Sequence, residues 1–177
     1  MVETKPTLIA FIGKSASGKT TLANYFSYKL EKYNLWISDT TRPQRVGEQE
    51  GHDYYFITEQ DFLNKLADNQ YLEGTCFRGW YYGHSKDSLT LRNIGIFDVK
   101  GIKNILKNHV NEFEHITIYY VQAGTIQRLK RSYKREGKWK IEYFRRLIAD
   151  FIDFLGLKHW IKKHLTSNIT FAIIKTG

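Results

Sequence analysis

The sequence predicts an α/β fold in which a parallel sheet is flanked by helices. Three observations lead to this expectation. A wholly apolar run, Leu8 to Ile12, is followed at once by a glycine-bounded loop and then by apolar residues at helical spacing. Short apolar strands alternate with helices along most of the chain, a pattern typical of parallel sheets covered on both faces. The length of 177 residues suits one domain with a sizeable core.

The loop after the first strand fits the pattern G-x-x-x-x-G-K-[ST] of a phosphate-binding P-loop. In such a loop the backbone N–H groups cradle a polyphosphate, and the following helix adds the positive end of its dipole. Lys19 would reach the β- and γ-phosphates, and the Thr20 hydroxyl would bind Mg²⁺. The alternative is an ordinary strand–turn–helix with an incidental lysine, but the apolar context favours a P-loop NTPase-type sheet. The residues predicted to bind the nucleotide are Gly13, Lys14, Ser15, Ala16, Ser17, Gly18, Lys19, Thr20 and Thr21.

The composition limits the class of protein. Apolar residues make up 42% and charged residues 25% of the chain, which is ordinary for a soluble globular protein. Cys76 is the only cysteine, so no internal disulfide can form and a reducing, cytoplasmic setting is expected. The first apolar run is too short to span a membrane, and no basic-then-apolar leader precedes it.

The net charge of +9 indicates an anionic partner. The excess gathers in residues 128–146, where nine Lys or Arg stand against two Glu. Within this segment Arg128, Arg131 and Arg135 share one face of a predicted helix, where like charges repel unless an anion docks there. A nucleic-acid binder and the cationic lid of a phosphotransferase both fit this pattern.

The remaining elements follow from apolar periodicity and turn residues. Strands are expected at 35–37, 51–58 (after a turn), 71–77, 94–99, 116–121 and 169–174. Helices are expected at 19–32, 59–67, 85–93, 101–109, 125–135 and 140–155. Thr58 is a plausible N-cap, and Gly79 to Gly83 are expected to form a tight aromatic turn. Asp98 lies near the carboxyl end of a strand, where ligands of open parallel sheets bind.

A second motif is more specific than the P-loop. It reads Ser38-x-Thr40-Thr41-Arg42-x-x-Arg45-x-Gly47-Glu48-x-x-Gly51-x-Asp53-Tyr54-x-Phe56, and it is followed by Glu73, Phe77-x-Gly79-x-Tyr81-Tyr82-Gly83 and Asp98-x-x-Gly101. Together with the P-loop, these residues resemble the guanylate kinase family over most of the chain.

The resemblance implies a GMP site. The residues that would hold the GMP phosphate are Arg42, Arg45, Tyr54 and Tyr82. Those that would read the guanine edge are Ser38, Glu73 and Asp98, because carboxylates accept the N1–H and 2-amino donors and a serine hydroxyl can meet O6. His84 belongs to the same predicted site, where the family normally has a small hydroxyl residue. Ile96 stands where many members have an additional aspartate.

The family also carries lid arginines. If Arg131-x-x-x-Arg135 takes the place of the family's lid motif, Arg146 falls at the spacing of the next arginine. With Lys19, these three would act catalytically by neutralising charge on the transferring phosphoryl group. A surface ion pair between Arg146 and Asp150, four residues on, is the plain alternative.

The resemblance therefore implies a nucleoside-monophosphate kinase that converts ATP and GMP to ADP and GDP with Mg²⁺. It implies one domain with a core of 5–37, 86–124 and 147–177, a small mixed α/β GMP-binding insertion at 38–85 and a helical lid at 125–146. A cytoplasmic monomer or homodimer that binds neither nucleic acid nor membranes is expected. The alternatives are a kinase of another small phosphorylated acceptor, a non-catalytic binding module of the same fold and, third, a nucleic-acid binder.

Overall fold

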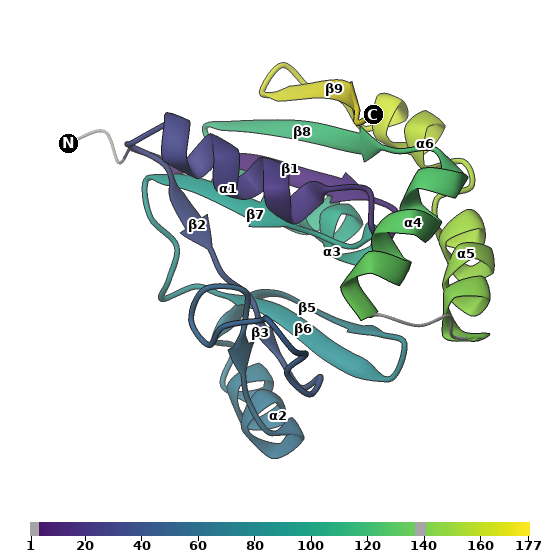
Figure 1. The fold of residues 1–177 in the computed structure, drawn as a ribbon. Helices are drawn as coiled ribbons and strands as arrows, with labels where there is room; N and C mark the ends of the chain where they lie inside the picture. Colours follow the sequence, from purple (N-terminus) through teal and green to yellow (C-terminus); the bar gives the residue numbers. More distant parts are fainter. Residues whose placement is uncertain (1–3, 137–140) are drawn as a thin grey trace.

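A parallel five-stranded sheet forms the centre of the larger part of the protein (Figure 1). The computed structural model describes residues 4–136 and 141–177, without the side chains of residues 135, 136, 141–144 and 146. The strand order is β2-β7-β1-β8-β9, and every neighbouring pair is parallel. The strands are β1 (Thr7–Gly13), β2 (Asn34–Trp36), β7 (Arg92–Ile96), β8 (His115–Gln122) and β9 (Ile169–Lys175).

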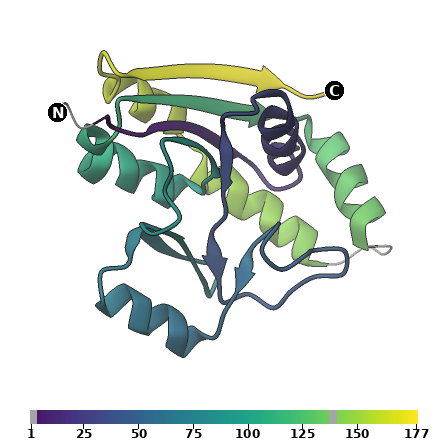
Figure 2. The same cartoon turned by 90° about the vertical axis from the view of Figure 1, so that its left-hand side faces the viewer.

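Strand β1 is buried on both faces, and successive residues enter two different cores. Leu8, Ala10 and Ile12 pack in a cluster with residues of α3 (Val99–Asn104), the π-helical segment Ile105–His109 and α6 (Leu157–Lys163). Ile9 and Phe11 pack on the other face against α1 (Lys19–Lys29). The alternation of side chains along a strand thus accounts for a sheet with helices on both faces, as Figure 2 shows.

A second, four-stranded sheet in the order β4-β3-β6-β5 is built from residues 39–85 (Figure 1, below the main sheet). Its strands are β3 (Asp39–Thr40), β4 (Tyr55–Phe56), β5 (Tyr71–Phe77) and β6 (Trp80–Ser85). Helix α2 (Glu59–Ala67) packs on this sheet through Phe62, whose ring stacks on Tyr71 and Tyr81. Gly83 is required at this contact, because an added Cβ would lie 2.9 Å from the Tyr71 ring.

Two further helices, α4 (Thr125–Glu136) and α5 (Ile141–Asp153), lie at the right of the molecule in Figure 1. Helix α4 begins shortly after β8 and its arginines reach the loop that follows β1. A 3-10 turn, Val110–Glu112, leads into β8. Among the described helices, none combines the length and apolar character that a membrane crossing requires.

The α/β fold with a parallel sheet is confirmed, but several expected elements are wrong. No helix forms at 85–93, because Asn93 bonds through its side chain to the N–H, the hydroxyl and the carbonyl of Thr90 and holds this segment as a turn before β7. Gly79 to Gly83 are mostly strand β6, and the turn is confined to Arg78 and Gly79, both with positive φ.

The helices near the end of the chain also differ from expectation. The expected helix 140–155 ends at Asp153, and Gly156, at φ +71°, precedes the separate helix α6. The helix expected at 101–109 begins earlier, at Val99, and its second half is π-helical. Helix 59–67 and its Thr58 cap are confirmed, with the Thr58 hydroxyl accepting the Asp61 N–H at 3.1 Å.

Candidate active site

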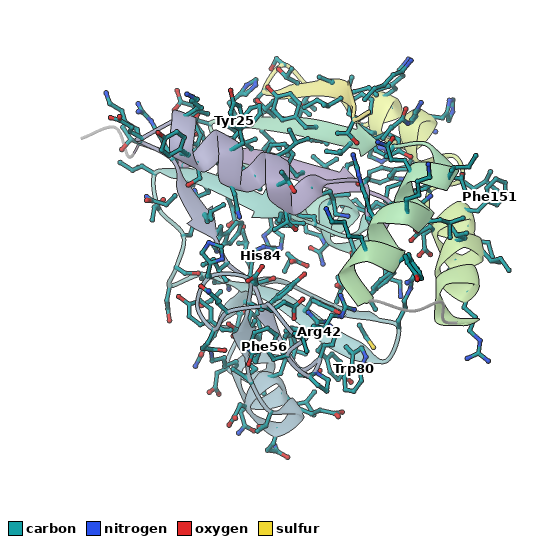
Figure 3. The ribbon with its side chains drawn as sticks, in the orientation of Figure 1. Tyr25, Arg42, Phe56, Trp80, His84 and Phe151 are labelled. Carbon is teal, nitrogen blue, oxygen red and sulfur yellow. The ribbon has the colours of Figure 1, made fainter. Side chains whose placement is uncertain are left out.

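One large cavity joins the P-loop to the smaller sheet. Its volume is about 860 Å³, and it is lined by residues from the loop after β1, from β2, from the segments before and after β3, from β5 and β6, and from the start of α3. Figure 3 shows that His84 lies where the two parts of the molecule meet and that Arg42 projects from the lower part. The predicted site residues that line it are Gly13, Ser15, Ala16, Ser17, Gly18, Lys19, Thr20, Thr21, Ser38, Arg42, Arg45, Tyr54, Glu73, Tyr82, His84, Asp98 and Arg131. Lys14 lines a neighbouring hollow of about 410 Å³ instead.

The P-loop is held in its curved shape by close backbone approaches. Gly13 has no room for a side chain, because an added Cβ would lie 2.4 Å from the Val121 carbonyl oxygen. Gly18 has φ +98° and directly precedes α1, a conformation that glycine adopts at little cost. The Lys19 ammonium folds back and donates to the carbonyl oxygens of Gly13 at 2.7 Å and Lys14 at 3.2 Å.

Arg42 is the centre of a cationic and aromatic group on the wall formed by the smaller sheet. Its guanidinium donates to both oxygens of Glu48, at 2.9 and 3.0 Å, and lies 5.2 Å from the Tyr54 ring centroid. Burial opposes its charge, but the hydrogen bonds and charge of Glu48 raise the pKa of Arg42 above its ordinary value. Arg45 lies beside it and donates its backbone N–H to Glu48. Arg42 is therefore cationic and fixed in direction.

Two tyrosines stand next to this arginine. The ring centroids of Tyr54 and Tyr82 are 6.0 Å apart, and the ring planes meet edge to face at 64°. Burial, followed by the influence of Tyr82, raises the pKa of Tyr54. Its hydroxyl accordingly stays protonated at neutral pH and is able to donate a hydrogen bond to an anion.

A buried carboxylate–imidazole pair lies deeper in the cavity. Oε1 of Glu73 is 2.6 Å from Nδ1 of His84, and both side chains are at least 96% buried. The other oxygen, Oε2, finds no hydrogen-bond partner within the described part of the chain. Because an ionised carboxylate only accepts, Nδ1 of His84 is the donor. The imidazole itself is fixed between the rings of Trp36 and Phe97, with centroids 4.7 and 4.5 Å away.

Asp98 is positioned by the first turn of α3. Oδ1 accepts the Gly101 N–H at 2.7 Å, so the residue acts as the helix N-cap, and Oδ2 accepts the Thr75 hydroxyl at 3.0 Å. Ser38, which is 92% buried, opens onto the same cavity. Two carboxylates and a hydroxyl therefore surround a region where a heterocycle with N–H donors would find acceptors.

The comparisons with known proteins decide the family. The sequence model of the guanylate kinase family matches residues 5–150 of this chain. The chain belongs to the guanylate kinase family.

Several guanylate kinases resemble this chain. The one from Mesomycoplasma hyopneumoniae is 32% identical over 153 residues, covering 79% of this chain and 76% of the relative. The one from Chlorobium chlorochromatii is 36% identical over 112 residues, covering 60% of this chain and 59% of the relative. The match to the Helicobacter pylori enzyme, 38% identical, covers 58% and 52%. The chain thus spans little more than half the length of several of these relatives.

A solved structure supports the fold. The crystal structure of guanylate kinase from Anaplasma phagocytophilum superposes with a TM-score of 0.67 and 18% sequence identity, over 98% of this chain and 78% of that one. At that identity the likeness is one of fold alone.

The arginines predicted to form a lid in this guanylate kinase family member are described in part. Arg131 lines the cavity and donates to the carbonyl oxygens of Ser17 and Gly177, at 3.1 and 2.8 Å. The side chains of Arg135 and Arg146 lie outside the described residues. The alternative interpretation of Arg146, a surface ion pair with Asp150, does not hold for Asp150, which is 97% buried.

Sequence reasoning missed three residues of this guanylate kinase fold. Asp150 accepts hydrogen bonds from Arg78 and Arg128 and from the P-loop N–H of Ser15. Arg128 carried a signal, since it shares a helical face with Arg131. Arg78 and Asp150 carried none, because their contacts join residues 72 positions apart.

The donor set fits a magnesium ion held mainly by a nucleotide. No group of three or more His, Cys, Asp or Glu suited to a metal occurs among residues 4–136 and 141–177. Mg²⁺ typically takes one or two protein oxygens together with phosphate oxygens and water. The Thr20 hydroxyl, next to Lys19 on the cavity wall, provides such an oxygen.

Proposed function

We propose that this chain transfers the γ-phosphoryl group of ATP to GMP, giving ADP and GDP. The observation that carries the proposal is the single cavity that joins Lys19 of the P-loop to Arg42, Tyr54 and Tyr82 on the smaller sheet. Two phosphate-binding groups that face one cavity suit a reaction between two nucleotides. Family membership supports the same reaction.

On the donor side, the P-loop would hold the phosphates of ATP. The predicted contacts come from the loop N–H groups, from the N-terminus of α1 and from Lys19, which would exchange its carbonyl partners for phosphate oxygens. Thr20 would hold Mg²⁺, which when bound neutralises charge on the phosphate oxygens.

On the acceptor side, Arg42 and Arg45 would grip the GMP phosphate, with Tyr54 and Tyr82 donating hydroxyl hydrogen bonds. Paired N–H donors of arginine match phosphate oxygens better than a lysine does. Ser38, Glu73 and Asp98 would meet the guanine edge, with His84 beside them. Adenine would leave some of these acceptors unpaired, which is the basis for selecting guanine.

The chemistry requires no general base, because the attacking phosphate oxygen of GMP is already anionic. Catalysis would come from alignment of the two phosphates and from cationic groups that stabilise the spreading negative charge: Lys19, Arg131, Arg135 and Arg146. Residues 125–146 would act as a lid that excludes water, and residues 38–85 as the GMP-binding insertion. A cytoplasmic monomer or homodimer, with small-molecule partners and no nucleic acid or membrane, completes the proposal.

A coupled ADP-release assay tests this function. ATP and Mg²⁺ are supplied with GMP, dGMP, AMP, UMP or CMP in separate reactions, and Lys19→Ala serves as the control. Turnover with GMP, alone or with dGMP, is expected. If a folded protein that binds ATP turned over none of the five, the acceptor would have to be a different phosphorylated molecule.

A further inference from the structure

Asp150 on α5 is hydrogen-bonded to the P-loop and is shielded from solvent. Its Oδ2 accepts the Ser15 N–H at 3.0 Å and a hydrogen bond from Arg128, while Oδ1 accepts Arg78 at 3.1 Å. The residue is 97% buried. One carboxylate thus gathers donors from the P-loop, from helix α4 and from the turn between β5 and β6.

These donors are of the type that binds phosphate. Backbone N–H groups of a P-loop typically donate to bound anions. Guanidinium groups pair with phosphate oxygens as readily as with carboxylate oxygens. Arg128 is also fixed in place, because its Nε donates to the Ser15 carbonyl oxygen at 2.8 Å. Ser15 of the P-loop is therefore held at its carbonyl oxygen by Arg128 and at its N–H by Asp150.

Arg128 requires an anion. It is 95% buried, and burial lowers its pKa while the charge of Asp150 opposes that effect. A buried cation without a partner is strongly destabilising. Either a carboxylate or a phosphate is able to meet this need, but two anions on the same donors repel each other.

We propose that the Ser15 N–H, Arg78 and Arg128 form an anion site for the phosphate chain of the donor nucleotide, and that Asp150 occupies this site until a phosphate displaces its carboxylate. The inference depends on the proposed function only for naming the phosphate chain as that of ATP. The carboxylate of Asp150 on α5 then competes with the nucleotide for the same donors. When its hydrogen bonds break, α5 is no longer attached to the P-loop.

Binding of inorganic tripolyphosphate, measured by calorimetry, tests the competition without any phosphoryl transfer. Asp150→Asn should bind tripolyphosphate roughly 5- to 150-fold more tightly than the wild type, the usual range of coupling between two binding events. The thermal midpoint of the ligand-free variant should fall, because Arg128 loses its charged partner. A purely structural role would lower the midpoint without tighter binding, and unchanged or weaker binding would overturn the proposal.

Asp153→Asn is the matched control. It removes the same charge from the same helix, one turn further on, from a residue that also lines the cavity. Its affinity should change by less than about twofold, since the contact with the P-loop is intact. Equal tightening in both variants would show a general charge effect and would overturn the proposal.

Hydrogen–deuterium exchange on the unaltered chain gives a second test, which holds even if Asp150→Asn does not fold. Tripolyphosphate should slow exchange in the P-loop and speed it in α5. Slower exchange in both segments, or no binding of tripolyphosphate at all, would overturn the proposal. The GMP assay on the same protein decides separately whether the phosphotransferase function fails.

Discussion

Glu73 and His84 face each other across the β5–β6 hairpin, and their side chains meet at 2.6 Å in the buried end of the cavity. The pair fixes the direction of a carboxylate that is predicted to read guanine. Since Oε2 finds no partner among the described residues, the carboxylate retains hydrogen-bonding capacity. An acceptor held in one orientation by a buried donor is suited to select among bases.

The first prediction concerns the strength of this coupling. His84→Ala should lower the free energy of unfolding by about 1–3 kcal/mol, because the buried carboxylate loses its hydrogen-bond donor. The double variant Glu73→Gln/His84→Ala should lose less stability than the sum of the losses in the two single variants, since the residues are in contact. Denaturant unfolding of the four proteins measures this.

The exposed pair His109 and Glu112, at 2.7 Å, is the control, and His109→Ala should cost under about 1 kcal/mol. Strict additivity at Glu73 and His84 would refute the coupling.

Two variants of Asp98 should separate its role as the N-cap of α3 from its predicted role in recognising guanine. Asp98→Ala removes the N-cap of α3 and should cost about 1 kcal/mol of stability. Asp98→Asn keeps an oxygen for the Gly101 N–H, so its stability should stay near that of the wild type. Its kcat/KM for GMP should nevertheless fall by about tenfold or more, because the carboxylate charge is lost. Steady-state kinetics and thermal unfolding check both variants, and wild-type kcat/KM in Asp98→Asn would remove Asp98 from the base site.

Arg42 should act chiefly in GMP binding. Arg42→Lys keeps the charge but loses the fork that holds Glu48 and faces the two tyrosines. The KM for GMP should rise about tenfold or more while the KM for ATP stays unchanged. Arg92→Lys, on an exposed position of β7, should leave both values unaltered. A parallel rise in both KM values after Arg42→Lys would indicate distortion of the whole cavity instead.

Lys19 should act in the chemical step. Lys19→Ala should lower kcat by about a hundredfold or more, since a cation at the transferring phosphate is removed. The thermal midpoint should stay near that of the wild type, because the ammonium donates to the Gly13 and Lys14 carbonyl oxygens of its own loop. Lys29→Ala, at the far end of α1, is the comparison variant. A kcat for Lys19→Ala within a few-fold of wild type would end the catalytic role of this residue.

What the sequence predicted well is local. The P-loop, the Thr58 cap and helix 59–67 depend on residues within a few positions of each other, so their patterns are legible in one stretch of chain. The main error at the site was also local. Because Gly79 to Gly83 were expected to form a turn, the register that pairs Glu73 with His84 was missed. A two-residue turn at Arg78 and Gly79 pairs Phe77 with Trp80, and the same register then places Glu73 opposite His84.

What the sequence did not predict depends on distant contacts. Ser15 and Asp150 are 135 positions apart, and no periodicity or motif links them. The position of Asp150, four residues after Arg146, allowed a surface pair as the alternative account of that arginine, and only the packing of α5 against the P-loop shows that Asp150 is buried. The separation of α6 from α5 depends on a single glycine with positive φ, which a helical apolar pattern conceals.

The transfer of the labelled γ-phosphoryl group tests the central claim most directly. ATP labelled with ³²P at the γ-position is incubated with the protein, Mg²⁺ and GMP, and the products are separated by chromatography. The account predicts that the label appears in GDP and that its appearance requires GMP and Lys19. Label that appeared in inorganic phosphate at the same rate with and without GMP, or that remained in ATP, would contradict it.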